Sequence, residues 1–509
     1  MDPDFEGRVL VVANRVPISI KTTQEGEFEY SMSSGGLVSG LKGLAKAIDF
    51  KWFGWPGIDV HRNDKDRVRR HLQDKFNAVP IFLAESLAEM HYNGFSNSIL
   101  WPLLHRMPDR AGSDERWSKA YQEVNEIFAD NIVPYVEDND IIWVHDYHLL
   151  LLPGILRERL SKKKNLKIGF FLHTPFPTED YFTILPFREQ ICKSLLLCDV
   201  VGFHTNQYAK DFLESARIVL EGVARSPSDL HWNGRKVIVH GFPLGIEADE
   251  WKQKLQTDAV KQEAANLRAE FDEQIIILGV DRLDYIKGIP QKLRAFDRFL
   301  TDHPEWVGKV VMVQLAIPSR EDVDTYRKLR EEVESLVGCI NGKHVKPEQL
   351  CALYAISDVL IVSSIRDGLN LVSYEYAACQ EERKGVLMMS TYAGAIKTLP
   401  PSSLILLNPW DTPRFAERIN QAVNMGMDER AQRHKEMMQV VDTWTRGNKQ
   451  VWKLTWKTHG GLNSVKWGKA FLHTMMTMEV PQEAEMPDRD SLVGWTSDVP
   501  DSESGTIRP

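Results

Sequence analysis

Short apolar runs recur along the chain, and each is followed by a polar or glycine-containing loop and then by residues with helical periodicity. In the first half, RVLVVANR leads to SSGGLVSGLKGLAKAI, and NDIIWVHDYH leads to LLLLPGILRERL. Later runs of the same kind include QIIILGVDRLD, KVVMVQLAIP and DVLIVSS. Continuous apolar strands that alternate with helices are typical of parallel sheets covered on both faces. The pattern therefore predicts an α/β protein with doubly wound parallel sheets.

The strand–helix units are too many for one sheet, and their alternation pauses at HGFPLGIEADEWKQKL. We expect two Rossmann-like domains that face each other across a cleft, made of residues 1–245 and 246–478, with the last helix crossing back. Residues 479–509 are acidic, rich in Pro and Ser and short of apolar residues, which predicts a disordered tail. Ligands of such sheets bind beyond the carboxyl ends of the strands, so the loops after strands should carry the chemistry.

The composition argues against some classes of binding partner. A net charge of −9 argues against a nucleic-acid surface, and 43% hydrophobic residues are ordinary for a globular chain of 509 residues. The N-terminus lacks the pattern of a signal peptide, and every apolar run is too interrupted to span a membrane. Five scattered cysteines, an odd number, are typical of reduced intracellular proteins: Cys192, Cys198, Cys339, Cys351 and Cys379. We expect a cytoplasmic protein without nucleic-acid or membrane partners.

In the first half of the chain, a strand ends at Asn14 and Arg15, and the pair Gly35-Gly36 precedes a helix. Glycines allow a close backbone approach, and the free amides of a helix start favour an anion. Taken alone, a glycine pair before a helix is more often a simple turn. It is not the G-x-G-x-x-G fingerprint, which weakens a dehydrogenase interpretation.

Two further strands of this half end in histidines. WVHDYHLL carries His145, Asp146 and His148, and the aspartate can accept hydrogen bonds from sugar hydroxyls or act as a base. The spacing also suits a metal, but polar cleft residues are the favoured interpretation. His173 in FFLHTPFP precedes a loop stiffened by prolines, where a structural histidine and a donor to a substrate hydroxyl are equally consistent with the pattern.

In the second half, GVDRLDYIKGI places Arg282 and Lys287 just after a strand. A planar guanidinium and a compact ammonium together suit a diphosphate leaving group, although a solvated charged turn is the commoner structure. Arg320, after VVMVQLAIPS, is a further candidate for a phosphate ligand.

The segment SSIRDGLNLVSYEYAACQ follows another strand and opens a helix near Asn370. Asp367 can take sugar hydroxyls, and the amides of Leu371 and Val372 can meet a diphosphate. A capping turn explains an Asp-Gly pair, but it does not explain Glu375 on an apolar helix, where a carboxylate can accept both ribose hydroxyls.

These residues lie in motifs that resemble the trehalose-6-phosphate synthase family of retaining glycosyltransferases, family 20, and its fungal members above all. The resemblance runs from about residue 8 to about residue 475. Its specific motifs are ANRVP, GGL, FGWPG, YNGFSNSILWPL, WVHDYHL, HTPFP, GFHT, RLDYIKG, PSR, RDGLNLVSYEY and KWGKAF. The resemblance implies the GT-B fold and the synthesis of trehalose 6-phosphate from UDP-glucose and glucose 6-phosphate.

The resemblance also implies the site residues. The transferred glucose would contact His173 and Asp367, which with Arg282 and Lys287 form the expected catalytic set. Glucose 6-phosphate would be held by Arg15, Tyr92, Trp101, Asp146 and Arg320. UDP-glucose would be held by Gly36, Arg282, Lys287, Leu371, Val372, Ser373, Tyr374 and Glu375.

The expected chemistry needs no metal and no cofactor besides the co-substrate UDP-glucose. Departure of UDP builds negative charge, which Arg282, Lys287 and the helix-start amides stabilise. Because no carboxylate is established as a nucleophile, we favour same-face attack, in which the leaving phosphate takes the acceptor proton while His173 supports the donor glucose.

Three departures from the family pattern stand out. Leu369 replaces the usual Met, a volume-conserving change. The segment after Asn341-Gly342 is short and lacks an aromatic position near the uracil, and residues 447–465 look like an insertion. We hypothesise an imperfect gene model with an omitted exon piece and a retained intron. A transcript that encodes both segments in full would reject this hypothesis.

Two other functions stay open. A non-catalytic regulatory subunit of a trehalose-synthesising complex would use the same fold as a scaffold, and the short segment favours it, whereas the intact Arg282, Lys287, Asp367 and Glu375 argue against it. An acceptor such as glycerol 3-phosphate is disfavoured by YNGFSNSILWP and ANRVP. The chain shows no D-x-D-x-T phosphatase loop, and we expect a homo-oligomer or a subunit of a synthase/phosphatase complex.

Overall fold

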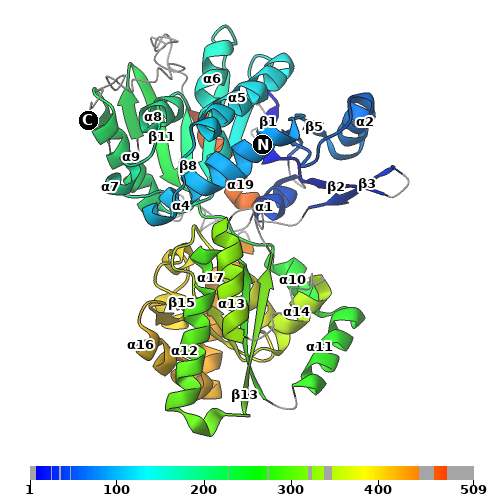
Figure 1. Ribbon diagram of the computed structural model, residues 1–509, viewed down its shortest axis with the longest axis vertical. Coiled ribbons are helices and arrows are strands. Elements are labelled where there is room, and N and C mark those ends of the chain that lie inside the picture. Colours follow the sequence, from blue (N-terminus) through cyan, green and yellow to red (C-terminus); the bar gives the residue numbers. More distant parts are fainter. Residues whose placement is uncertain are drawn as a thin grey trace, which may run out of the picture.

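The computed structural model describes residues 7–23, 26–33, 36–45, 48–226, 229–271, 274–318, 324–337, 347–445 and 464–478. These residues form two lobes, each built around its own sheet (Figure 1). The nine-stranded sheet of the first lobe ends with a strand at residues 235–241, and the five-stranded sheet of the second lobe begins at residue 275. The predicted architecture of two doubly wound sheets is therefore confirmed.

The first lobe is organised by strands in the order β5-β4-β1-β6-β7-β8-β11-β10-β9. Their bounds are β1 (Val9–Arg15), β4 (Phe50–Trp55), β5 (Ala78–Pro80), β6 (Ile141–His145), β7 (Lys167–Leu172), β8 (Val200–Phe203), β9 (Ala224–Arg225), β10 (Asp229–Trp232) and β11 (Arg235–Gly241). The strands from β5 to β11 are parallel, as predicted.

The edge of this sheet differs from the all-parallel prediction, because β9 and β10 run antiparallel to their neighbours. The physical reason is a two-residue turn between β10 and β11. Asn233 and Gly234 both have positive φ, 48° and 72°, which is the backbone that a tight hairpin needs. An Asn-Gly pair between two strands is itself a hairpin signal in the sequence.

Helices and short turns of the first lobe fill the intervals between strands. The α-helices are α1 (Gly36–Ala45), α2 (Lys65–Phe76), α3 (Glu85–Glu89), α4 (Trp101–Leu104), α5 (Glu115–Ile132), α6 (Leu152–Arg159), α7 (Glu179–Phe182), α8 (Arg188–Leu196) and α9 (Asn206–Val219). A π-helix spans Met90–Leu100, and 3-10 turns lie at Arg62–Asp64, Pro108–Arg110, Val133–Tyr135 and Tyr147–Leu149. The hairpin of β2 (Ile18–Thr22) and β3 (Phe28–Met32) projects from the lobe (Figure 1).

The second lobe has a wholly parallel sheet in the order β13-β12-β14-β15-β16. Its strands are β12 (Ile275–Arg282), β13 (Val310–Ile317), β14 (Val359–Val362), β15 (Val386–Ser390) and β16 (Ile405–Leu407). Its helices are α10 (Ala248–Leu255), α11 (Asp258–Glu270), α12 (Ile289–Asp302), α13 (Asp324–Val337), α14 (Pro347–Ile356), α15 (Val372–Cys379), α16 (Thr412–Val423) and α17 (Met427–Thr445). Its 3-10 turns lie at Tyr285–Lys287, Pro304–Trp306, Gly394–Lys397 and Pro401–Ser403.

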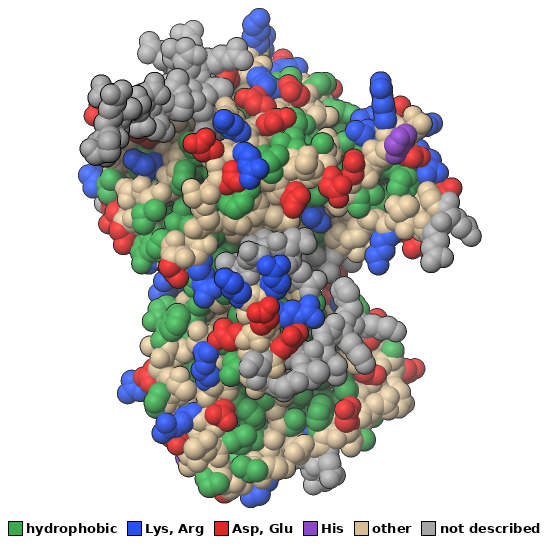
Figure 2. Space-filling view, viewed as in Figure 1, with side chains coloured by type: hydrophobic (Ala, Val, Ile, Leu, Met, Phe, Trp, Pro, Cys, Tyr) green, Lys and Arg blue, Asp and Glu red, His purple; other side chains and the backbone are tan. Residues whose placement is uncertain are grey.

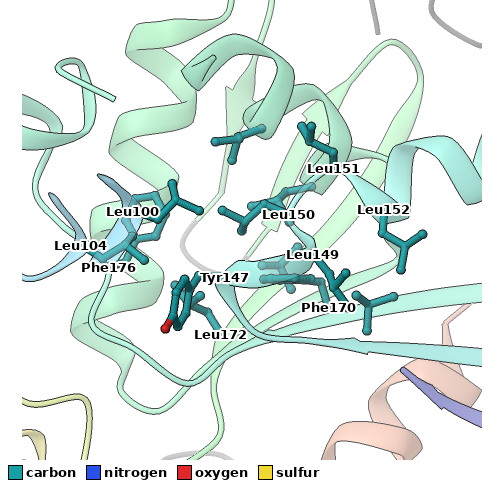
Figure 3. Close-up of a cluster of buried hydrophobic side chains, with 14 of the residues drawn as sticks. Leu100, Leu104, Tyr147, Leu149, Leu150, Leu151, Leu152, Phe170, Leu172 and Phe176 are labelled. Carbon is teal, nitrogen blue, oxygen red and sulfur yellow. The ribbon is translucent and has the colours of Figure 1, made fainter. Parts of the chain in front are cut away.

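The core of the first lobe explains why its central strands read as unbroken apolar runs. β6 is buried along its whole length, and its alternate residues enter two different hydrophobic clusters, one on each face of the sheet. Figure 3 shows one of these clusters, where Leu149 to Leu152 meet Phe170 and Leu172 of β7. A strand covered on both faces has no solvent side, so polar residues are pushed to its ends, where the loops begin.

The final helix, α19 (Ser464–Thr477), belongs by contact to the first lobe, and Figure 1 draws it in orange within that lobe. Phe471 stacks on Trp143 of β6 with ring centroids 4.6 Å apart. The Lys167 ammonium donates to the carbonyl oxygens of Met475, Met476 and Met478 at 2.5, 3.0 and 2.7 Å. The chain thus returns to the first lobe after completing the second.

Figure 2 shows the molecule narrowing where the two lobes meet. Several contacts among the described residues join the lobes, and two of them lie beside Asp367. The Tyr208 hydroxyl of α9 donates to the Asp367 carbonyl oxygen at 3.1 Å, and Gly368 lies against the carbonyl oxygen of His173. The carboxyl ends of the two sheets therefore face each other.

Candidate functional site

The predicted site residues gather at the carboxyl ends of both sheets. Arg15 ends β1, Asp146 follows β6, and His173 follows β7 in the first lobe. In the second lobe, Arg282 ends β12, and Asp367 lies in the loop between β14 and α15. Gly36 is the first residue of α1, which confirms its predicted place at a helix start. Arg320 lies outside the described residues.

Polar contacts of the second lobe converge on Asp367. Its Oδ2 accepts hydrogen bonds from the Lys287 ammonium at 2.5 Å, the Ser364 hydroxyl at 3.1 Å and the Asn370 amide at 3.1 Å. Burial by itself would raise the pKa of this carboxyl, but the Lys287 ammonium and the Asn370 hydrogen bond lower the pKa to about 2. Asp367 is therefore a fixed anion that holds Lys287 at the rim of the second sheet.

Arg282 reaches from the second lobe to the first. Its guanidinium lies 5.4 Å from the ring centroid of Trp101, the first residue of α4. A second contact joins Arg282 Nη2 to the buried carboxylate of Asp284 at 3.4 Å. The Arg282 side chain is 41% exposed, so part of its fork of donors is open to a ligand.

The helix α15 starts with a turn that its sequence specifies. Asn370 has φ of 79°, in the left-handed region that Asn tolerates, and its side-chain oxygen accepts the Ser373 backbone amide at 3.3 Å. Leu371 and Val372 follow this turn and are partly exposed, while Ser373 and Tyr374 are buried. The backbone amides of Ser373 and Tyr374 are already bonded, to Asn370 Oδ1 and to the Leu371 carbonyl oxygen, so the amides of Leu371 and Val372 are the ones suited to an anion at this helix start.

Glu375, one turn inside α15, is held by the neighbouring helix α14. The Tyr354 hydroxyl donates to Glu375 Oε2 at 3.0 Å. Burial raises the pKa of the Glu375 carboxyl to about 7, and the Tyr354 hydrogen bond and the Lys254 charge only partly oppose this shift. A carboxyl with this pKa changes its protonation state near neutral pH.

Arg15 of the first lobe is held between two aromatic rings. Its guanidinium lies 4.8 Å from the ring centroid of Trp55 and 5.1 Å from that of Tyr92. Gly57 packs beside it with φ of 85°, and a Cβ there would lie 3.3 Å from Arg15 Nη1. Cation–π contacts orient the guanidinium and leave its N–H groups available to a phosphate.

Asp146 has an unusual backbone, with φ of 73° and ψ of 166°. Its Oδ1 accepts the backbone amide of His173 at 3.2 Å, and its backbone amide donates to the Phe171 carbonyl at 2.8 Å. Tyr92 stacks on His148 beside it, with an interplanar angle of 7°. The strained turn thus ties the loops after β6 and β7 together, consistent with a ligand-binding role.

His173 belongs to a group of three imidazoles. His145 was predicted only as a polar cleft residue, and His204 was not predicted as a site residue. His173 Nε2 lies 3.1 Å from His145 Nδ1, and the His204 ring is 5.2 Å away. Burial, together with the neighbouring His204 and His145, lowers the pKa of His173 well below its usual value. The available signal was the position of all three residues at the ends of adjacent strands.

Ser364, Asn370 and Tyr208 were also absent from the predicted set. Each contacts Asp367, through its side chain or its carbonyl. Ser364 and Asn370 flank Asp367 in the sequence, so their proximity was visible there, whereas Tyr208 lies 159 positions away.

Two features, a metal-binding cluster and a membrane-spanning helix, are absent from the part of the chain that the structure describes. It contains no group of three or more His, Cys, Asp or Glu side chains arranged to hold a metal ion. Among the same residues, no helix is long and apolar enough to cross a membrane.

The sequence is similar to known proteins over most of its length. The profile of glycosyltransferase family 20 matches residues 7–455. A UDP-forming alpha,alpha-trehalose-phosphate synthase of Candida albicans is 47% identical over 457 residues, which cover 87% of this chain and 95% of that protein. The 56 kDa subunit of the Saccharomyces cerevisiae synthase is 47% identical over 486 residues, which cover 92% of this chain and 94% of that protein.

Solved structures show the same fold at lower identity. An E. coli structure bound with UDP-2-fluoro glucose has a TM-score of 0.78 and 31% identity, covering 94% of this chain and all of that one. A Burkholderia xenovorans synthase in complex with glucose-6-phosphate has a TM-score of 0.77 and 28% identity, and the match covers 92% of this chain and 100% of that one. Both resemble this chain across the two lobes.

Proposed function

Since this chain belongs to glycosyltransferase family 20, we propose that it transfers glucose from UDP-glucose to glucose 6-phosphate and retains the anomeric configuration. The products are trehalose 6-phosphate and UDP. The fold is GT-B. One observation carries the proposal: Lys287, bonded to Asp367, and Arg282, set against Trp101, stand where the second lobe meets the acceptor side of the first.

The donor UDP-glucose binds against the second lobe in this proposal. Arg282 and Lys287 neutralise the diphosphate, and the amides of Leu371 and Val372 at the start of α15 add hydrogen-bond donors, with Ser373 and Tyr374 beside them in the donor site. Glu375 accepts the ribose hydroxyls, and Gly36 lets the backbone of α1 approach the donor. His173 and Asp367 contact the transferred glucose.

The acceptor glucose 6-phosphate binds against the first lobe. Arg15, already oriented by Trp55 and Tyr92, takes the phosphate together with Arg320. Asp146 accepts a sugar hydroxyl, and Tyr92 and Trp101 provide the walls of the acceptor site. The positions of Arg15 and Asp146 at the ends of β1 and β6 support this division between donor and acceptor lobes.

The positive charges that stabilise the leaving UDP are already in position before the bond breaks. As the bond between glucose and UDP breaks, negative charge grows on the diphosphate, where Arg282 and Lys287 stabilise it. The acceptor hydroxyl attacks from the face that UDP leaves, and the leaving phosphate oxygen takes its proton. Asp367 keeps Lys287 in position, because its carboxylate stays ionised at every physiological pH.

No metal ion enters this proposal, in which Arg282 and Lys287 supply the positive charge beside the diphosphate. Dialysis against a chelator tests it. Activity that persists after dialysis supports metal independence, and activity that is lost and then restored by a divalent ion would refute it.

A second candidate function is a regulatory subunit of a larger trehalose-synthesising assembly. The subunit designation of the S. cerevisiae relative motivates it, and it predicts a homo-oligomer or a complex with a synthase or phosphatase partner. The short segment after Asn341-Gly342, up to residue 346, lies outside the described residues, and so do residues 447–463 of the predicted insertion 447–465. We place the protein in the cytoplasm on the strength of its sparse cysteines.

The deciding experiment is donor and acceptor profiling of the purified chain with identification of the product. We expect UDP release and trehalose 6-phosphate only when UDP-glucose and glucose 6-phosphate are both present. A silent protein that still joins a larger complex would establish the regulatory function instead. Faster turnover with glycerol 3-phosphate would correct the acceptor.

A further inference from the structure

The imidazoles of His145 and His173 share one hydrogen bond. His145 is the last residue of β6, His173 follows the neighbouring strand β7, and 3.1 Å separates His145 Nδ1 from His173 Nε2. At this distance one ring donates and the other accepts. The direction of the bond therefore decides which nitrogen of His173 carries its hydrogen.

The surroundings of His145 determine that direction. The residue is fully buried, its ring lies 4.5 Å from the Trp143 ring and 6.1 Å from the Trp467 ring, and Nε2 bonds no group in the described part of the chain. The neighbouring indoles offer N–H donors and no acceptor. A hydrogen on Nε2 would be a buried, unsatisfied donor, whereas a bare Nε2 costs less. His145 therefore carries its hydrogen on Nδ1.

Both rings are neutral, so each has a single N–H. Burial lowers the pKa of His145 to about 3 and holds that of His173 well below its usual range. With the Nδ1–H of His145 directed at Nε2 of His173, the hydrogen of His173 must sit on its own Nδ1.

We propose that His145 is a positioning residue that fixes His173 as the Nδ1–H tautomer, so that His173 donates a hydrogen bond to a hydroxyl oxygen of the transferred glucose. This inference rests on the role of His173 in the proposed function. The backbone of His173 is already held, by Asp146 Oδ1 at its amide and by Gly368 against its carbonyl. Only the placement of the ring hydrogen is left for His145 to set.

Nitrogen NMR of the unliganded protein tests the tautomer without any assay of activity. In protein labelled with 15N in the histidine rings, the two ring nitrogens of a neutral imidazole differ in shift according to which bears hydrogen. The variants His145→Asn and His173→Asn identify the two sets of signals. We expect hydrogen on Nδ1 of both rings, and a His173 ring with hydrogen on Nε2 would overturn the proposal.

Two substitutions of equal size test the positioning role. Asn carries a polar amide near the place of Nδ1, and Leu carries only methyl groups, so His145→Asn can keep the bond that His145→Leu removes. We expect kcat/KM for UDP-glucose to be at least about tenfold lower in the Leu variant than in the Asn variant, which is equivalent to about 1.4 kcal/mol. Equal kcat/KM in the two variants, at equal Tm, would refute the role.

The two tests separate this inference from the proposed function. If the parent protein releases no UDP but shows the Nδ1–H tautomer, the function is wrong and the tautomer assignment stands. If the parent protein makes trehalose 6-phosphate and shows hydrogen on Nε2 of His173, the positioning role is wrong and the function stands.

Discussion

At the scale of single residues, Asp367 before α15 and Glu375 within it show how two carboxyls close in sequence can have very different pKa values. Asp367 is paired with Lys287, which keeps its pKa at about 2. Glu375 faces the Tyr354 hydroxyl with no cation in hydrogen-bond contact among the described residues, so burial dominates and its pKa rises to about 7. The environment, not the residue type, sets the charge.

Replacement of Lys287 by Ala should lower kcat by about 100- to 1,000-fold, because charge that develops on the diphosphate loses its partner and Asp367 is left as an unpaired buried anion. The readout is UDP release at saturating substrates. Lys309→Ala is the control, since Lys309 is exposed and precedes β13 at the opposite end of the sheet. A Lys287→Ala variant with near-normal kcat/KM would remove Lys287 from the catalytic set.

Glu375 predicts a dependence of stability on pH. Its pKa in the folded protein, about 7, exceeds the ordinary value of 4.5, so the folded state binds this proton more tightly. The free energy of unfolding therefore falls as pH rises from 4.5 to 7 and levels off above. Glu375→Gln should remove this loss of stability. The Tm of the variant minus the Tm of the parent protein should therefore be larger at pH 8 than at pH 5.

Glu382→Gln, at an exposed site close in sequence, controls for the change in net charge. A Tm difference between Glu375→Gln and the parent that does not vary between pH 5 and pH 8 would contradict the raised pKa.

At the scale of elements, α19 is the segment whose position is set by contacts far away in the sequence. Trp467 and Phe471 are fully buried against β6 and β7, and Lys167 binds the last carbonyls of the helix. A cation at a helix C-terminus satisfies carbonyls that have no partner within the helix. The return of α19 thus couples the end of the chain to the sheet that bears His145 and His173.

Lys167→Ala should lower the free energy of unfolding by about 1.5–3 kcal/mol, the range of hydrogen bonds to charged groups, because three carbonyl oxygens lose one donor. Denaturant unfolding measures it. The exposed Lys162 offers the matched control Lys162→Ala. If both variants unfold at the same denaturant concentration as the parent, the ammonium does not hold α19.

At the scale of the whole molecule, the enzyme works at the contact between two lobes. It joins a glucosyl unit from UDP-glucose to glucose 6-phosphate with retention, and each substrate has its own lobe in the proposed assignment. One contact between the lobes lies where the loop after β14 meets the loop after β7, with Gly368 against the His173 carbonyl oxygen. Small displacements there change the distance between donor and acceptor.

Gly368→Ala tests that contact. A Cβ at this position would lie 2.5 Å from the His173 carbonyl oxygen, a backbone atom that cannot move alone, so the lobes must separate. We expect kcat/KM to fall by about 10- to 100-fold through misalignment. Gly426→Ala is the control, because its Cβ would meet no atom within 4 Å. Unchanged kcat/KM in Gly368→Ala would show that the loops need not touch during turnover.

The sequence by itself determined the two parallel sheets and the placement of chemistry in the loops that follow their strands. Strands such as β6 and β12 must be apolar throughout when helices cover both faces, so polar residues such as Asp146 and Arg282 stand out at their ends. The antiparallel edge at β10 was missed although Asn233-Gly234 signalled it, because a short strand carries little periodicity.

Only the tertiary structure decided which of these side chains meet. Lys287 and Asp367 are 80 positions apart, His145 and His173 are 28 apart, and Arg282 contacts Trp101 of the other lobe. Periodicity reports which face of an element is buried, but not which neighbour lies across it. The pKa of Glu375 and the direction of the His145–His173 bond depend on that neighbour, because burial and hydrogen bonding act over a few ångströms in space, whatever the separation along the chain.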